Sequence, residues 1–124
     1  MAGPKLDGAG VAKMTTLETA MNQVQRLHTV VELCGVAVKG NKPVASFIPQ
    51  IKRAGHPLVG LLKSQYGLIS DQASAFLLVS TRGGTNDQSR LRALREGLAQ
   101  LRVQIELAIA KVQELHTVEK AHDT

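Results

Sequence analysis

Residues 91–115, LRALREGLAQLRVQIELAIAKVQEL, carry the pattern that decides the fold. Apolar residues recur in this stretch at alternating steps of three and four, which places them on one side of an α-helix. The members of this apolar seam are Leu91, Leu94, Leu98, Leu101, Ile105, Ala108, Val112 and Leu115. Such a seam packs lengthwise against neighbouring helices at a shallow crossing angle. We therefore predict a long C-terminal helix, on the order of 45 Å at about 1.5 Å per residue.

A second seam with the same spacing lies nearer the start of the chain. Its members are Leu17, Ala20, Val24, Leu27, Val31, Cys34 and Val38. Thr15 and Glu18 match a capping box, in which a hydroxyl and a carboxylate each accept a hydrogen bond from a free N–H at a helix start. We predict a first helix that begins at this box and ends at Gly40. Residues 1–13 have no apolar period, so we expect a flexible N-terminal arm there.

Shorter apolar faces separated by breaks occupy the middle of the chain. After a connector at 40–43, Val44, Phe47, Ile48 and Ile51 form a second apolar face, and Pro49 favours a helix start near Ser46. Residues 55–57, Gly-His-Pro, predict another reversal. The third face follows as Leu58, Leu61, Leu62, Tyr66, Ile69, Ala73, Phe76 and Leu77. Gly67 either kinks or divides that helix, and Thr85 with Gln88 offers a cap for the last one.

Composition supports an all-helical fold. Aromatic residues make up only 2% of the 124 residues, with no tryptophan, whereas residues that favour helices dominate from Thr15 onward. We predict an all-α protein, an antiparallel bundle of about four helices with a long C-terminal helix, over residues 14–120. The reversals fall at 40–43, 55–57 and 82–85, and residues 121–124 form a tail. Helices two and three lie end to end or side by side.

The same composition excludes several functional classes. The shortage of aromatic residues argues against proteins that stack bases on Phe or Tyr platforms. No apolar run approaches the roughly 20 residues that span a bilayer, and the single cysteine, Cys34, forms no internal disulfide. We therefore expect a soluble, cytoplasmic protein without a membrane partner.

Few residues suggest catalysis. His28 and Glu32 lie four residues apart on one helix face, but no third ligand accompanies them, so we interpret them as a surface pair. Cys34 lies on the first seam as a buried structural thiol, and His116 complements the negative end of the last helix. We expect no catalytic residue, no metal site and no cofactor, and the protein is not predicted to be an enzyme.

Charge is the most informative functional signal. The formal net charge is +5, and no acidic residue lies between Glu32 and Asp71. That interval and the start of the last helix each hold a group of basic residues. The ten candidates for contact with a nucleic-acid backbone are Lys39, Lys42, Lys52, Arg53, Lys63, Arg82, Arg90, Arg92, Arg95 and Arg102. If the fold brings the two groups together, they form one stripe that neutralises phosphates. An acidic protein partner and simple solvation of a helical surface are the alternatives.

A smaller apolar set lies off the main seam of the last helix. It consists of Val103, Leu107 and Ala110. One interpretation is a wider buried face within the monomer, and the other is a contact with a further subunit. We predict the subunit contact, with other proteins or with copies of the same chain.

Two stretches carry a resemblance to known families. Residues 46–53, SFIPQIKR, with Gly55 and residues 75–77, resemble a helix-turn-helix region in small subunits of CRISPR effector complexes, which line a nucleic-acid channel as helical bundles. Residues 97–102 and 105–108 are similar to the four-helix accessory proteins of diversity-generating retroelements. Both resemblances imply a non-enzymatic helical subunit in a nucleoprotein assembly.

The sequence thus predicts a non-catalytic subunit that contacts the phosphate backbone of RNA or DNA without base specificity. The competing class is an adaptor bundle of the focal-adhesion-targeting kind, which accepts a partner helix against an apolar groove. The seams of the chain suit both classes equally well. Salt dependence of binding separates the two, because phosphate contacts weaken steeply as salt rises.

Overall fold

The computed structural model describes residues 6–82 and 86–116, and four α-helices and one 3-10 turn account for almost all of this part of the chain. In order they are α1 (Gly8–Lys39), the turn η1 (Ala45–Phe47), α2 (Ile48–Leu62), α3 (Gly67–Arg82) and α4 (Asp87–His116). The prediction of an all-α protein with a long C-terminal helix is confirmed.

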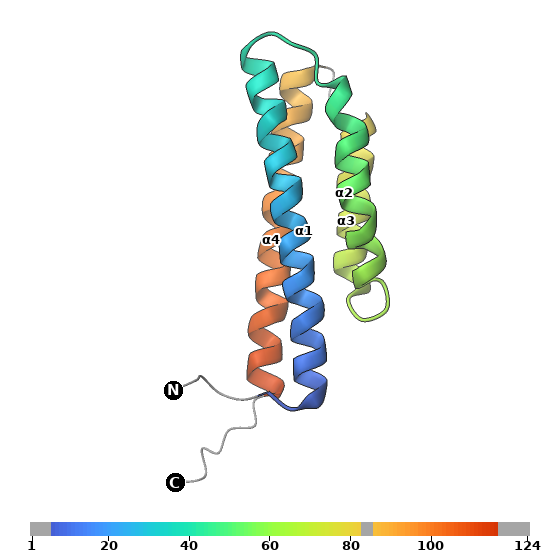
Figure 1. Ribbon diagram of the computed structural model, residues 1–124, viewed down its shortest axis with the longest axis vertical. Helices are drawn as coiled ribbons and strands as arrows, with labels where there is room; N and C mark the ends of the chain where they lie inside the picture. Colours follow the sequence, from blue (N-terminus) through green and yellow to red (C-terminus); the bar gives the residue numbers. More distant parts are fainter. Residues whose placement is uncertain (1–5, 83–85, 117–124) are drawn as a thin grey trace.

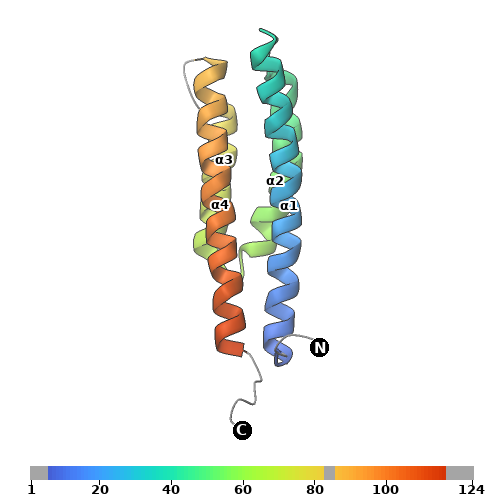
Figure 2. The ribbon, with the colours of Figure 1, turned by 90° about the vertical axis from the view of Figure 1, so that its left-hand side faces the viewer.

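The helices form an antiparallel bundle in which each helix has two neighbours. Helix α1 packs against α4 and α2, and α3 packs against α2 and α4. Among the described residues the diagonal pairs, α1 with α3 and α2 with α4, have no Cα atoms within 8 Å of each other. Figure 2 shows α1 and α4 side by side in front of the shorter pair. This arrangement leaves one side of the bundle formed by α1 and α4 alone.

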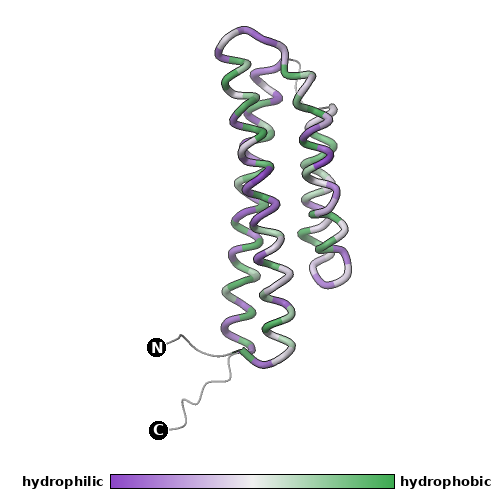
Figure 3. Tube along the Cα trace, viewed as in Figure 1, coloured by the Kyte–Doolittle hydropathy of each residue, from purple (hydrophilic) through white to green (hydrophobic). Residues whose placement is uncertain are grey.

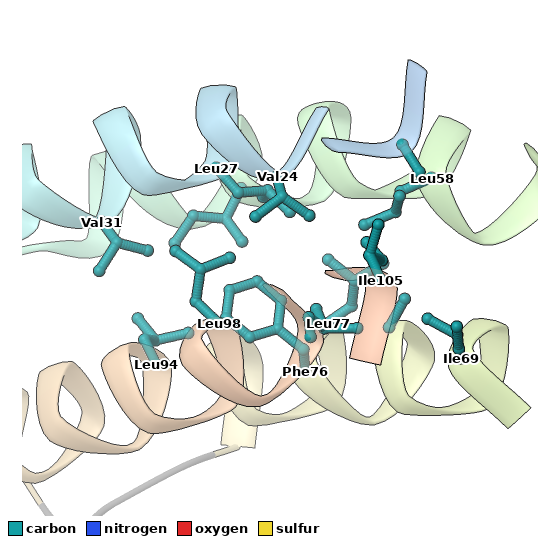
Figure 4. Packing of buried hydrophobic residues seen from close by; sticks show 14 of the residues in the cluster. Val24, Leu27, Val31, Leu58, Ile69, Phe76, Leu77, Leu94, Leu98 and Ile105 are labelled. Atoms are coloured by element: carbon teal, nitrogen blue, oxygen red, sulfur yellow. The ribbon is translucent and has the colours of Figure 1, made fainter. Parts of the chain in front are cut away.

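One hydrophobic core fills the centre, and all four helices contribute to it (Figure 4). The side chains that point into it include Val24, Leu27 and Val31 of α1, Leu58 of α2, Phe76 and Leu77 of α3, and Leu94, Leu98 and Ile105 of α4. Both predicted seams therefore face the core along most of their length, with Ala37 buried in place of the expected Val38 and Leu115 exposed at the end of α4. The burial of these stripes, rather than intrinsic helix propensity, supplies most of the stability of such helices.

The two pairs of helices differ in length. With 32 and 30 residues, α1 and α4 measure about 45–48 Å, whereas the 15 and 16 residues of α2 and α3 measure about 22–24 Å. Figure 1 shows α1 and α4 running on below the loop that joins α2 to α3. We call the four-helix part the closed block. The turns of α1 and α4 beyond it, residues 8–13 and 108–116, are the open end.

Helix α1 begins earlier than predicted. Asp7 is its N-cap, and one carboxylate oxygen accepts a hydrogen bond of 2.6 Å from the N–H of Gly10. The Thr15 hydroxyl lies inside the helix and donates to the carbonyl of Val11. The predicted start at Thr15 is therefore wrong, and so is the flexible arm where it covers residues 8–13, because Asp7, eight residues upstream of Thr15, already provides a cap. Residues 1–5 lie outside the described part.

The predicted reversal at 55–57 is also wrong, because α2 runs without interruption through Pro57. Its buried face consists of Ile51, Gly55, Leu58 and Leu62, and it continues past the exposed Pro57 ring. Packing of that face outweighs the single backbone hydrogen bond that the proline removes. The chain turns at residues 63–66 instead, and α3 begins at Gly67. Helices α2 and α3 are consequently a side-by-side hairpin.

The end of α1 at Gly40 agrees with the prediction, whereas α2 begins at Ile48, after the turn η1, rather than near Ser46. The connector at 40–43 separates α1 from η1, and Asn41 adopts a left-handed φ of 59° there. Helix α4 is capped by Asn86, whose side-chain oxygen accepts a bond of 2.8 Å from the N–H of Ser89. The expected cap residue Thr85 and the tail at 121–124 lie outside the described residues.

Candidate nucleic-acid interface

A groove runs between α1 and α4 on the side of the bundle that faces away from the α2–α3 hairpin (Figure 2). It consists of two adjoining hollows of about 620 and 250 Å³. The residues that line it are His28, Val31, Glu32, Gly35, Val38, Lys39, Gln88, Leu91, Arg92, Arg95, Glu96, Leu98, Ala99 and Arg102. We call this feature the α1/α4 groove. Four of the ten predicted phosphate-binding residues lie in it: Lys39, Arg92, Arg95 and Arg102.

Helical spacing explains why these cations meet. Arg95 and Arg102 are seven residues apart, which puts them on the same edge of α4, and that edge faces α1. On α1 the facing positions include Gly35, where a Cβ atom would lie only 2.6 Å from Nη2 of Arg95. The missing side chain at Gly35 therefore lets the Arg95 guanidinium lie against the backbone of α1.

Both arginines are held by partners on α1. Nε and Nη2 of Arg95 each donate to a carboxylate oxygen of Glu32, at 3.3 Å, in a bidentate pair. Nη2 of Arg102 donates to the side-chain oxygen of Gln25 at 3.4 Å. The side chains of the ion pair are each about half exposed, so the pair adds little to stability. Its geometric effect is larger, because it orients a guanidinium toward the groove.

Sequence reasoning missed two residues: Gln25, which accepts the hydrogen bond from Arg102, and Gly35, which lines the groove. A signal for them exists in the sequence, since Gln25, His28, Glu32, Gly35 and Lys39 recur at steps of three and four beside the apolar seam of α1. This polar stripe faces α4. Glu32 pairs with Arg95 across the groove, whereas the sequence suggested His28 as its neighbour.

Two more predicted cations lie near the upper end of the groove. Lys42 borders an adjoining hollow together with Asn41, Pro43 and Asp87. Arg90 lies apart from the groove lining, with Nη1 3.3 Å from a carboxylate oxygen of Asp87 and only 24% of its side chain exposed. Arg82 ends α3, and its side chain lies outside the described part of the chain. Of the two described side chains, that of Lys42 adjoins the α1/α4 groove and that of Arg90 does not.

The single basic stripe considered from the sequence does not form. Lys52 and Arg53 are exposed on α2, and Lys63 is exposed in the turn that follows it. No Cα atom of α2 lies within 8 Å of one in α4. The basic residues between Glu32 and Asp71 therefore fall into two groups. The first lysines lie near the α4 arginines, and the later basic residues lie on another face of the bundle. Helical topology causes this division, because α2 and α4 occupy diagonal corners of the bundle.

The apolar set on α4 is exposed. Val103, Leu107 and Ala110 point away from the core, so the interpretation as a wider buried face of the monomer is wrong. A subunit contact at these residues stays a prediction.

Other candidate groups agree with structural roles. Cys34 is buried, as predicted, and its burial raises the pKa of the thiol. Within residues 6–82 and 86–116, no three His, Cys, Asp or Glu side chains gather closely enough to hold a metal ion. His122 lies outside the described residues.

His116 has a role that the sequence did not suggest. Its carbonyl accepts a bond of 2.9 Å from the N–H of Asp7, and its Nδ1 lies 3.2 Å from the Asp7 carboxylate. The Nε2 atom lies 3.3 Å from Nζ of Lys13. These contacts join the last turn of α4 to the first turn of α1. No periodic pattern links residues so far apart in the chain, so only the fold reveals them.

Comparison with known proteins adds no further constraint. No protein-family model matches the chain, and no match was found among curated proteins or among solved structures. In the described part of the chain, none of the helices combines the length and apolar character that crossing a membrane requires.

Proposed function

We propose that this protein is a non-catalytic helical subunit that binds the phosphate backbone of a nucleic acid along the α1/α4 groove. The observation that carries the proposal is the convergence of Lys39, Arg92, Arg95 and Arg102, from two helices, on one groove. Guanidinium groups suit phosphate because their planar forks donate two hydrogen bonds at once. The resemblance to small subunits of nucleoprotein complexes implies the same function.

Backbone contact without base recognition is the mode that the residues favour. Of the three aromatic side chains, Phe76 is buried, Phe47 is partly buried and Tyr66 lies outside the groove. Stacking of bases on aromatic rings, which supports most sequence-tolerant binding of single strands, therefore has no platform there. Contacts to phosphate carry little sequence information, so the expected binding is indifferent to base sequence.

The acidic residues in the groove limit the expected affinity. Glu32 and Glu96 lie among the cations, and Glu32 already pairs with Arg95. A phosphate has to compete with Glu32 for that guanidinium. We therefore expect modest affinity from one copy, and useful affinity where several copies line one strand in a larger complex.

The test measures binding of a labelled single-stranded oligonucleotide by fluorescence anisotropy over a series of salt concentrations. Four phosphate contacts predict a slope of about −3 in a plot of log affinity against log salt. The double variant Arg92→Glu/Arg102→Glu should lower affinity sharply at low salt, and its slope should be about 1.5 smaller in magnitude. The matched control is Lys52→Glu/Lys63→Glu, which changes the net charge equally at two exposed positions, one on α2 and one in the turn that follows it.

Retained binding in the α2 control is the result that supports the groove. Equal losses in both double variants would show that total charge, rather than the groove, governs binding. Binding that ignores salt and follows substitutions at Val103 and Leu107 would favour the adaptor class instead. Circular dichroism of each variant checks that the helical fold is intact.

A further inference from the structure

The open end exposes a second groove, on the inner face of α1 and α4 just below the α2–α3 loop. Lys13 of α1, Tyr66 of the loop, and Ala108, Lys111, Val112, Leu115 and His116 of α4 line it. Its volume is about 270 Å³. We call it the open-end groove. It shares no lining residue with the α1/α4 groove, so it is independent of the function proposed above.

The floor of the open-end groove is a continuation of the bundle core. Ala108, Val112 and Leu115 extend the same seam that is buried as Leu101 and Ile105 higher in α4. Exposure rises along this seam from 0% at Ile105 through 4% at Val112 to 65% at Leu115. Figure 3 shows hydrophobic segments continuing on α1 and α4 below the hairpin. The seam therefore runs beyond the helices that cover it.

The shape of the gap favours a helix as its occupant. In the closed block, the inner faces of α1 and α4 are covered by α2 and α3. Below the loop the same two faces continue, and a further helix laid there would extend the bundle geometry. A small molecule fits less well, since ligand sites usually enclose most of their ligand and this groove is open along one side.

The rim of the groove is positively charged. Lys13 and Lys111 stand on opposite helices, and His116 lies between them near the helix ends. No acidic residue lines the groove in the described part of the chain. Asp7 is engaged with Gly10 and His116, and Glu114, one turn from Lys111 on α4, lies outside the lining. The Tyr66 side chain adds a hydroxyl group, whose partial burial raises its pKa and keeps it protonated.

We infer that the open-end groove docks an acidic amphipathic helix of a partner protein. Apolar side chains of that helix cover the exposed Leu115 and the partly buried Ala108, over the buried Val112, and its carboxylates pair with Lys13 and Lys111. A second copy of the chain fits poorly, because its own Lys13 and Lys111 would face the same cations. A flat anionic membrane fits poorly as well, since the apolar floor lies in a recess between two helices and the hairpin loop.

The experiment uses three synthetic helical peptides that differ only in charge. Each carries leucines at steps of three and four, flanked by Glu in the first peptide, by Gln in the second and by Lys in the third. Binding to the full chain is followed by fluorescence anisotropy of the labelled peptide. Amide shifts of ¹⁵N-labelled protein locate the site. We expect the Glu peptide to bind most tightly, with shifts at residues 108–115 of α4 and at the first turns of α1.

A matched pair of leucine variants tests the position of the site. Leu115 and Leu107 are both exposed on α4, but only Leu115 lines the groove. Leu115→Gln should weaken binding of the Glu peptide about tenfold or more, because it removes one apolar anchor. Leu107→Gln should leave binding unchanged. Lys13→Glu/Lys111→Glu should reverse the preference, so that the Lys peptide binds better than the Glu peptide.

Several outcomes would overturn the inference. One is absence of shifts at residues 108–115 with the Glu peptide, and another is equal binding of all three peptides. A dimer that Leu115→Gln dissociates would assign the groove to a second copy. Binding of phosphatidylglycerol vesicles that depends on Lys111, without peptide binding, would assign it to a lipid surface. These measurements of peptide, dimer and vesicle binding do not depend on the α1/α4 groove. Variants of that groove that lose oligonucleotide binding should therefore give the same results in all of them.

Discussion

Helices α1 and α4 pass through two different environments, the closed block and the open end. Leu101 and Leu115 show the contrast, because they are the same residue type on the same seam of the same helix. Leu101 is 1% exposed in the closed block, whereas Leu115 is 65% exposed at the open end. The seam alone therefore determines which side of α4 faces inward. Whether that side is covered depends on how long the neighbouring helices are.

The largest predicted effect on stability comes from replacing each of these two leucines by alanine. Leu101→Ala should lower the free energy of unfolding by about 2–5 kcal/mol, because it leaves a cavity in a packed core. Leu115→Ala should change it by less than about 0.5 kcal/mol, as expected for an exposed side chain. Urea unfolding followed by circular dichroism measures both. A similar loss in the two variants would mean that the open end is covered in solution.

Two glycines of α2 provide the next test, within the closed block. A Cβ atom at Gly55 would lie 2.4 Å from Cδ2 of the buried Leu77, while at Gly60 nothing lies within 4 Å. Gly55→Ala should destabilise the fold by about 1–3 kcal/mol through overpacking. Gly60→Ala should stabilise it by up to about 1 kcal/mol, because alanine favours the helix. Thermal unfolding of both variants checks this, and stabilisation by Gly55→Ala would contradict the close α2–α3 packing.

At the open end, the contribution of Asp7 to the stability of the fold is expected to depend on pH. The hydrogen bond from Gly10 is the main cause that lowers the pKa of Asp7 below 3.8, and His116 and Lys13 act in the same direction. A lowered pKa in the folded state means that ionised Asp7 stabilises the fold above pH 3.8. This contribution is lost as the pH falls through the lower, folded-state pKa.

Asp7→Asn should therefore be less stable than the wild type at neutral pH, and the difference should shrink in acid. Asp71→Asn, at an exposed position in α3, is the control. Urea unfolding at several pH values gives the comparison, and amide exchange in the first turn of α1 reports it locally. A difference between wild type and Asp7→Asn that stays constant with pH would contradict the capping role.

The smallest stability effect is expected in the α1/α4 groove. Glu32→Gln removes the partner of Arg95, a half-exposed ion pair, and should cost less than about 1 kcal/mol in unfolding. Its effect on binding should be opposite in sign, because an acidic competitor leaves the groove and Arg95 becomes available to phosphate. Anisotropy titrations should show tighter oligonucleotide binding than in the wild type. Weaker binding would contradict a phosphate site at Arg95.

Much of the fold could be predicted from local pattern. The seams of α1 and α4, the buried Cys34 and the connector at 40–43 all follow from helical periodicity and turn chemistry. Pro57 was misjudged because a local rule, that proline ends helices, was applied to a residue whose helix is stabilised by tertiary packing. The early start of α1 was missed because its cap, Asp7, is joined to His116 at the far end of the chain.

The candidate site was predictable only in part. The basic residues are visible in the sequence, but their grouping depends on which helices are neighbours. Lys39 joins Arg92 because α1 contacts α4, and Lys52 does not because α2 lies diagonally opposite. The open-end groove has an indirect sequence signal, since the long seams of α1 and α4 exceed the short helices between them. The difference in length can be recognised only when the chain reversal is placed at 63–66 rather than at 55–57, because that position sets the lengths of α2 and α3.

The most direct test of the central claim is an amide-shift titration of the ¹⁵N-labelled chain with a single-stranded oligonucleotide at low salt. A phosphate site in the α1/α4 groove predicts the largest shifts at residues 25–39 of α1 and 92–102 of α4. Residues 52–62 of α2, Lys63 in the following turn and the open end should stay unchanged. Shifts centred on α2, or none at all, would contradict the assignment of nucleic-acid binding to this groove.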